Sequence, residues 1–154
     1  MASIDYPAEL PTPHRAGYAI QHASPFIRTE MSTGRARQRR AFTSLPSSIP
    51  LQWLLTNAQA QIFEAWFAYD ITDGTDWFNL ALTTPVGRLE FYECRFSEMY
   101  SGPALVGLDR WRYTAKVEIR KRPLLPKDWY LIGREFVLGA DIIDQAMNRE
   151  WPEA

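Results

Sequence analysis

Residues 109–121, DRWRYTAKVEIRK, alternate apolar and charged side chains almost without interruption, and this pattern limits the possible folds more than any other in the chain. In an extended strand, successive side chains point to opposite faces. One face then carries Trp111, Tyr113, Ala115, Val117 and Ile119, and the other carries Arg110, Arg112, Lys116, Glu118 and Arg120. We predict a half-buried β-strand whose charged face meets water, a partner or a lumen.

The 154 residues are 46% hydrophobic, which is enough for the core of one domain. A formal net charge of -1 gives no overall attraction for nucleic acid, so any DNA contact is expected to be local and transient. The single cysteine, Cys94, cannot form an intramolecular disulfide, and its strand-like surroundings predict a half-buried side chain. We expect no signal peptide and no membrane contact, because no basic region leads into an apolar one and no apolar run is long enough to span a bilayer.

Three regions follow from the pattern along the chain. Residues 1–16 contain three prolines and are predicted to form an extended N-terminal arm that orders on a partner rather than packing. Residues 17–124 read as a β-rich domain, and residues 125–154 as a C-terminal extension. Early in the domain, the Ser24-Pro25 break and the turn signal at residues 32–34 predict a hairpin.

A strand followed by a helix is predicted next. Residues 48–56 place Ile49, Leu51, Trp53 and Leu55 on one face, with Pro50 at the start of the strand or at an edge. The helix should begin at Thr56 or Asn57 as its N-cap and run to about Tyr69. Its buried face is predicted to consist of Ile62, Phe63, Trp66 and Phe67.

The remaining strands are expected at residues 77–84, 88–96 and 111–120, with residues 97–109 as a long connection. Residues 127–138 are expected to be a strand or loop, followed by a short helix at residues 141–151. The predicted fold class is therefore mainly β with one packed helix, as a β-sandwich or partly closed barrel, plus the N-terminal arm and the C-terminal extension.

Local signals for chemistry are weak. Residues 70–76 hold three aspartates and Gly74, but the twelfth position of a calcium loop would be Ala81, so we assign a turn. His14 and His22 lack metal-ligand spacing, and no nucleophile motif occurs. We predict no catalytic site, no metal and no cofactor. The alternative is a small hydrolase whose site assembles in space from carboxylates such as Glu64, Glu90 and Glu93.

A row of arginines is the sharpest charge feature. On a strand, Arg35, Arg37 and Arg39 point one way and Arg40 points the other. Aligned guanidinium groups suit carboxylates or phosphates, so a solvated face, a protein interface and a DNA contact all stay open. Tryptophans in the terminal segment add candidate anchors. The predicted partner-binding residues are Arg35, Arg37, Arg39, Arg40, Arg110, Arg112, Lys116, Arg120, Trp129 and Trp151.

The order of these parts resembles the minor tail proteins of the lambda-type tail-tip hub, which are related in fold to distal tail proteins of long-tailed phages. The resemblance covers residues 17–124. It lies in the early Gly-Tyr segment of residues 17–46, the aromatic helix, turn and Trp-aromatic strand of residues 57–85, the strand at 87–96 and the alternating strand at 111–124.

The resemblance implies a tail-tube-like fold and a structural role without a reaction. It implies a subunit of a homo-oligomeric, hexameric ring that connects the tail tube protein to the hub and other baseplate proteins, in the virion's tail, made in the bacterial cytoplasm. Within this class, a tail-tube, tail-terminator or neck-ring protein is the alternative. Outside it stand a nucleic-acid-binding β-barrel that uses residues 35–40 with exposed aromatics, and the small hydrolase.

Overall fold

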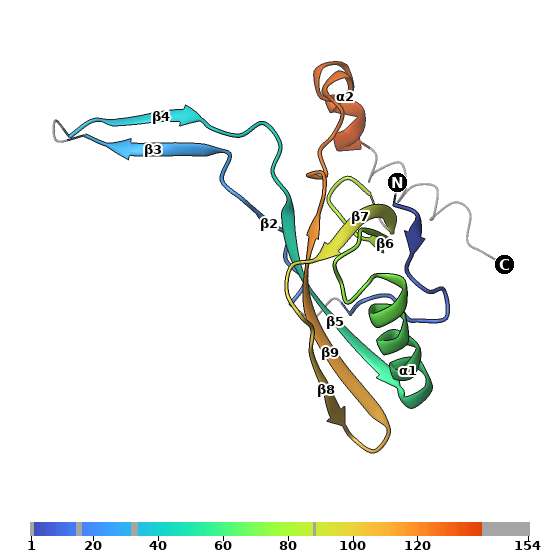
Figure 1. Cartoon of the computed structure of the whole chain (residues 1–154). Coiled ribbons are helices and arrows are strands. Elements are labelled where there is room, and N and C mark those ends of the chain that lie inside the picture. Colours follow the sequence, from blue (N-terminus) through green and yellow to red (C-terminus); the bar gives the residue numbers. More distant parts are fainter. Residues whose placement is uncertain (1, 15–16, 32–33, 88, 140–154) are drawn as a thin grey trace. The chain divides into compact units, whose positions relative to one another are not determined.

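Figure 1 shows the computed structural model of the chain, which describes residues 2–14, 17–31, 34–87 and 89–139. The chain divides into two compact units, Met1–Arg122 and Pro123–Ala154. All strands of the described residues belong to the first unit.

A seven-stranded mixed sheet forms the body of the first unit, in the order β1-β6-β7-β9-β5-β2, with β8 also paired to β9. Only β1 and β6 run parallel among these pairs. A separate two-stranded sheet joins β3 and β4. The predicted mainly-β fold with one packed helix is confirmed. The strands are β1 (Ile4–Asp5), β2 (Gln21–His22), β3 (Phe26–Glu30), β4 (Ala36–Arg40), β5 (Ser47–Thr56), β6 (Phe78–Leu82), β7 (Glu90–Phe96), β8 (Ser101–Val106) and β9 (Arg110–Ile119).

The antiparallel pair β5–β9 is the longest in the sheet and runs in register from Ser47 opposite Ile119 to Thr56 opposite Arg110. Burial alternates along both strands, as the sequence predicts. The buried apolar residues are Ile49, Leu51, Trp53 and Leu55 on β5, and Tyr113, Ala115, Val117 and Ile119 on β9. These two rows form the part of the core that the sheet contributes.

Pro50 lies within β5. Because proline has no backbone N–H, it must face a side of the strand where no ladder hydrogen bond is needed. The backbone N–H of His14 donates to the carbonyl of Gln52 at 2.7 Å, on the side of β5 away from β9. Residues two apart turn their backbone groups the same way, so Pro50 faces that side too. There β5 pairs only with the short β2 and the His14 bridge, so the predicted edge position is correct.

The packed helix is α1 (Asn57–Ala65), which continues as a π-helical turn, η1 (Trp66–Asp70). It begins with a capping box: the N–H of Gln59 donates to Thr56 Oγ1 at 3.4 Å, and the N–H of Thr56 donates to Gln59 Oε1 at 3.1 Å. Phe63 packs on the sheet, with its ring centroid 5.0 Å from that of Tyr113. Thr56 is thus the N-cap that the sequence predicts.

The helix face differs from the prediction at one residue. Phe63, Trp66 and Phe67 are buried as expected, but Ile62 is 40% exposed and Ala60 takes its place in the core. Residues one apart on a helix are rotated by about 100°, so Ile62 cannot share the stripe of Ala60 and Phe63. The π turn, with the N–H of Ile71 donating to the carbonyl of Trp66, then brings two consecutive aromatics inward.

The N-terminal arm packs on its own domain, which corrects the expectation that residues 1–16 stay unpacked. β1 pairs with β6, and the Asn79 side chain binds both backbone groups of Ala2 and donates to Asp5 Oδ1 at 2.7 Å. Leu10 is only 6% exposed. The prolines fix the backbone locally, but they leave Leu10 and Tyr6 free to cover the core.

Residues 97–109, predicted to be a connection, contain a strand. β8 pairs with the first half of β9, with a bulge between Ser101 and Ala104. All of β8 is exposed except Val106, which is half-buried, so no burial alternation marks it in the sequence. Gly102 and Pro103 further weaken the strand signal.

The second unit is helical where the structure describes it. α2 (Lys127–Ile132) starts after Pro126 with Asp128 in its first turn, and residues 134–139 continue as a helix after Gly133. The expected strand or loop over residues 127–138 is therefore wrong; the aromatic and aliphatic residues there had favoured a strand, whereas Pro126 and Asp128 suit a helix start. The helix expected at residues 141–151 lies outside the described residues.

Candidate partner-binding surfaces

The hairpin β3–β4 stands out because none of the residues that the structure describes buries it. We call residues 26–42 the basic ribbon. The two strands pair antiparallel from Phe26 opposite Arg40 to Glu30 opposite Ala36, which confirms the predicted hairpin. Every residue of both strands is exposed. A two-stranded hairpin of this kind is marginally stable on its own, so its surface is suited to a partner.

The arginines of the basic ribbon alternate as the sequence predicts. Arg37 and Arg39 lie on one face of β4, Arg35 immediately precedes the strand, and Arg40 lies on the opposite face. Arg40 Nε donates to the carbonyl of Phe42 at 3.1 Å. In contrast, the side chains of Arg35, Arg37 and Arg39 form no hydrogen bond or ion pair with any residue that the structure describes. Three guanidinium groups are thus free to bind a partner.

Apolar side chains share the basic ribbon with the arginines, and sequence reasoning missed them. Across the two strands, Ile27 faces Arg39, and Arg28 on β3 faces Gln38. Arginine, methionine and aromatic residues are the types enriched in protein interfaces. The mixing of apolar and charged residues on both faces, without clean alternation, was the available signal. The exposed apolar residues are Phe26, Ile27, Met31 and Phe42.

Charge is segregated between the basic ribbon and the rest of the chain. The ribbon holds five arginines and one glutamate, a formal charge of +4, while the whole chain carries -1. The remaining residues therefore carry -5. A positive ribbon on a negative body favours an acidic protein partner over a polyanion that meets the whole molecule.

The outer face of β9 presents a second row of cations, of which one is already engaged. Arg110, Arg112 and Lys116 are exposed, as predicted. Arg120 Nη1 donates to Glu93 Oε2 at 3.3 Å, and its guanidinium lies 5.5 Å from the ring centroid of Trp77. Arg120 thus helps to hold β9 against its neighbours in the sheet, whereas the other three point to solvent.

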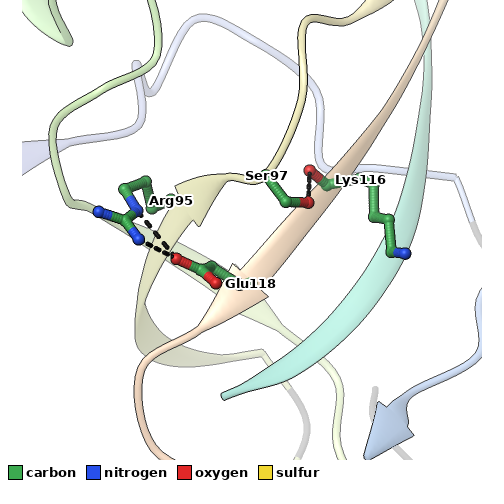
Figure 2. A network of polar contacts seen from close by, with 4 residues as sticks. All are labelled: Arg95, Ser97, Lys116 and Glu118. Atoms are coloured by element: carbon green, nitrogen blue, oxygen red, sulfur yellow. Dashed lines mark hydrogen bonds and ion pairs between the residues drawn. The ribbon is translucent and has the colours of Figure 1, made fainter. Parts of the chain in front are cut away.

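Figure 2 shows that residues in the middle of this face bind one another through polar contacts. Arg95 Nε donates to Glu118 Oε1 at 2.9 Å across the β7–β9 pair, and Ser97 Oγ donates to the carbonyl of Lys116 at 2.8 Å. The Arg95 guanidinium also lies 4.7 Å from the Trp77 ring centroid. The Lys116 side chain extends away from the Arg95–Glu118 pair, so its ammonium stays available.

The second unit exposes a cluster of large apolar side chains. Trp129, the predicted anchor on α2, is 55% exposed, and Ile132 and Phe136 are 84% and 72% exposed. With Asp128 and Gly133 they line a hollow of about 430 Å³. The other predicted anchor, Trp151, lies outside the described residues.

One serine–histidine pair invites comparison with a catalytic dyad. His22 Nδ1 lies 2.8 Å from Ser47 Oγ, beside a groove of about 910 Å³ lined by Tyr18 and Thr83 among others. Ser47 is only 1% exposed, so its hydroxyl cannot reach a substrate in the groove. Tyr18 donates to the carbonyl of Thr83 at 2.8 Å, and burial raises the pKa of Tyr18 to about 12. These contacts fasten the start of the domain to the sheet.

Cys94 is fully buried rather than half-buried, because it faces the core opposite Phe78 and Ile119. Burial raises the pKa of its thiol to about 12, so it stays protonated and unreactive near neutral pH. Within residues 2–14, 17–31, 34–87 and 89–139, no three His, Cys, Asp or Glu side chains gather to hold a metal.

No helix within the described ranges is both long and apolar enough to cross a membrane. Comparisons with protein-family models, with curated proteins and with solved structures find no match for this chain. The functional argument therefore depends on the surfaces themselves.

Proposed function

We propose that this chain is a structural subunit of a phage tail-tip ring that connects the tail tube to the hub and fibre-bearing proteins. Two features support the proposal. The order of segments resembles the minor tail proteins of lambda-type phages, and the mainly-β fold carries one helix on its sheet. The observation on which the proposal chiefly depends is the basic ribbon, exposed on both faces.

The basic ribbon is costly unless it has a partner. Ordering each of its residues opposes folding by about 1–2 kcal/mol, and no burial within the described chain offsets this cost. It also leaves four large apolar side chains in water. A neighbouring subunit that covers the ribbon would supply the missing burial, which is the ordinary logic of a protein that functions in an assembly.

Several separate surfaces favour an assembly with more than one kind of neighbour. The basic ribbon, the outer face of β9 and the apolar cluster around Trp129 belong to different elements. In a closed ring, each subunit contacts its two neighbours through two different patches. The remaining surfaces can then bind the tail tube protein, the hub and other baseplate proteins. The hexameric symmetry is carried by the family resemblance. Tail-tube, tail-terminator and neck-ring proteins form the alternative within this class.

Electron microscopy of the intact particle tests the function. The chain should appear as a ring at the tail tip beside the last layer of the tail tube. Its location can be marked by a small tag at the exposed tip Gly107–Leu108 of the β8–β9 hairpin, away from the basic ribbon. A ring at the neck would move the chain to the alternative class, and absence from the particle would refute the structural role.

A nucleic-acid module is the second candidate, because a two-stranded ribbon fits the major groove of DNA and this one carries a charge of +4. The body charge of -5 opposes that use. We expect only weak duplex binding at about 50 mM salt, lost at about 150 mM, in a fluorescence anisotropy titration. Submicromolar binding at the higher salt that disappears in Arg37→Ala/Arg39→Ala, but not in Arg110→Ala/Arg112→Ala, would establish the DNA reading instead.

A further inference from the structure

The chain that directly follows the basic ribbon has the opposite charge. Residues 41–87 contain no lysine, arginine or histidine. They contain four carboxylates, Glu64, Asp70, Asp73 and Asp76, all on α1, η1 and the turn after them. The segment that follows the ribbon therefore carries a formal charge of -4, whereas the ribbon carries +4. The negative charges lie on a different structural element from the ribbon.

These carboxylates lie on one short exposed stretch. Asp70 is the last residue of η1, and Asp73 adopts a positive φ of 55° in the turn that follows. Asp76 closes the same turn, since Thr72 Oγ1 donates to Asp76 Oδ2 at 2.7 Å. Glu64, which lies earlier on α1, accepts a hydrogen bond of 2.8 Å from the Tyr113 hydroxyl. The turn is well fixed by its own contacts, so its charges are presented in a set arrangement.

Apolar side chains accompany the carboxylates, as they accompany the arginines of the basic ribbon. Tyr69 is 83% exposed and Ile62 is 40% exposed, and both flank the acidic residues on α1 and η1. Ile62, which was predicted to be buried, thus belongs to a second surface that combines apolar and charged side chains. We call Ile62, Glu64, Tyr69, Asp70, Asp73 and Asp76 the acidic turn.

Among the described residues, no ion pair neutralises either surface. Arg35, Arg37 and Arg39 form no ion pair among the described residues, and the same holds for the carboxylates of Asp70 and Asp73. Two unpaired surfaces of opposite charge and similar apolar content, both present in every copy, complement each other between copies.

We propose that the basic ribbon of one copy docks on the acidic turn of a second copy. The contact rests on the proposed ring function, which requires each subunit to meet the next one through two different patches. Such a contact is heterologous, so a series of copies joined in this way closes into a ring when the rotation per subunit permits. Planar guanidinium groups bind carboxylates in bidentate pairs, and the flanking apolar residues exclude water around them.

A charge-reversal experiment separates this contact from nonspecific attraction. Variant A carries Arg37→Glu and Arg39→Glu in the basic ribbon; variant B carries Asp70→Lys and Asp73→Asn in the acidic turn, where Asn tolerates the positive φ. Wild type should associate in sedimentation velocity at about 100 µM and about 50 mM salt, and less at about 500 mM salt. Each variant alone should stay monomeric, because the ribbon of variant A carries a formal charge of 0 and the acidic turn of variant B only -1. A mixture of A and B should associate into pairs, because B keeps an intact basic ribbon and A keeps an intact acidic turn.

The matched control carries the same charge change at two exposed residues outside the proposed contact, as Lys121→Glu and Arg122→Glu. It should associate with itself as wild type does, because its basic ribbon and its acidic turn are intact. A control that stays monomeric as variant A does would overturn the proposal, since the change in net charge alone would then explain the loss of association. Monomeric wild type under all these conditions would also overturn it.

Photo-cross-linking identifies the surfaces directly. A benzoylphenylalanine at Thr29, which is exposed on β3 opposite Arg37 and therefore on the same face of the basic ribbon, should form adducts within residues 62–76 of a second, isotope-labelled copy. Adducts on another surface of the second copy would refute this pairing while leaving the ring function intact. Adducts at the acidic turn in a protein that electron microscopy does not find in tails would uphold the pairing and refute the tail function.

Discussion

The pairs β5–β9 and β3–β4 are both antiparallel, yet they differ in burial. In β5–β9, every second residue is buried except Trp111, which is half-buried, and α1 covers the buried face. In β3–β4, no residue is buried on either face. Antiparallel pairing alone is therefore not enough to place a strand in the core. What differs is whether a second layer covers the strands: α1 covers β5–β9, and no described residue buries the ribbon.

The largest expected effect tests the core side of this comparison. Phe63 is fully buried between β5 and β9, with its ring centroid 5.4 Å from that of Trp53 and 5.0 Å from that of Tyr113. Phe63→Ala should lower the free energy of unfolding by about 3–5 kcal/mol, because it leaves a cavity. Ile62→Ala is the matched control and should cost less than about 1 kcal/mol. Similar denaturant midpoints for the two variants would contradict the helix orientation.

Alkaline pH should weaken the core. Folding raises the pKa of Cys94 from 9.0 to about 12, so the folded thiol keeps a proton that the unfolded chain loses. The stability is present below pH 9 and is lost as pH rises, by roughly 1.4 kcal/mol per pH unit between about 9 and 12. Cys94→Ala should make the slope of unfolding free energy against pH shallower by that amount. An unchanged slope in denaturant titrations would contradict the buried thiol.

A smaller effect is expected at the junction of β5 and α1. Thr56 ends β5 and caps α1 through Gln59. Thr56→Ala removes one half of the capping box and should cost about 1 kcal/mol, whereas Thr56→Ser keeps the oxygen and should cost less. Chemical denaturation of both variants provides the measurement, and equal losses would argue against the cap.

The smallest effect on stability is expected in the basic ribbon. Arg37→Ala/Arg39→Ala should change the unfolding free energy by no more than about 0.5 kcal/mol, because neither side chain has a partner in the described chain. The same double change should abolish association between copies. A stability loss comparable to that of Phe63→Ala would show that the ribbon packs on its own domain.

The sequence allowed the body of the fold to be predicted wherever burial leaves a periodic imprint. The alternation of Trp53 and Leu55 on β5 and of Tyr113 and Val117 on β9 is visible without coordinates, as is the Thr56 cap. β8 was not predictable, because it is held by backbone pairing and its side chains stay exposed. Likewise, the packing of Leu10 depends on a surface that exists only in the folded domain.

For the partner-binding surfaces, the positions of the charged residues could be predicted from the sequence. Which of these residues are paired within the folded chain could not. Both rows of cations were evident, yet only the β7–β9 register shows that Arg120 meets Glu93 and Trp77. The free state of Arg37 and Arg39 likewise depends on the absence of any covering element among the described residues. The exposure of Ile62, which the helical pattern placed in the core, depends on how α1 lies on the sheet.

Hydrogen exchange followed by mass spectrometry tests the central claim most directly, because it compares the two antiparallel pairs in one experiment. In the isolated chain, amides of β5 and β9 should exchange by global unfolding, while those of β3 and β4 should exchange by local opening, faster by about three orders of magnitude or more. In assembled tails, or in low-salt oligomers, the ribbon amides should become protected and those of β5 and β9 should change little. Ribbon amides as slow as those of β5 in the monomer, or still fast in the assembly, would contradict the claim that a neighbouring molecule completes the ribbon.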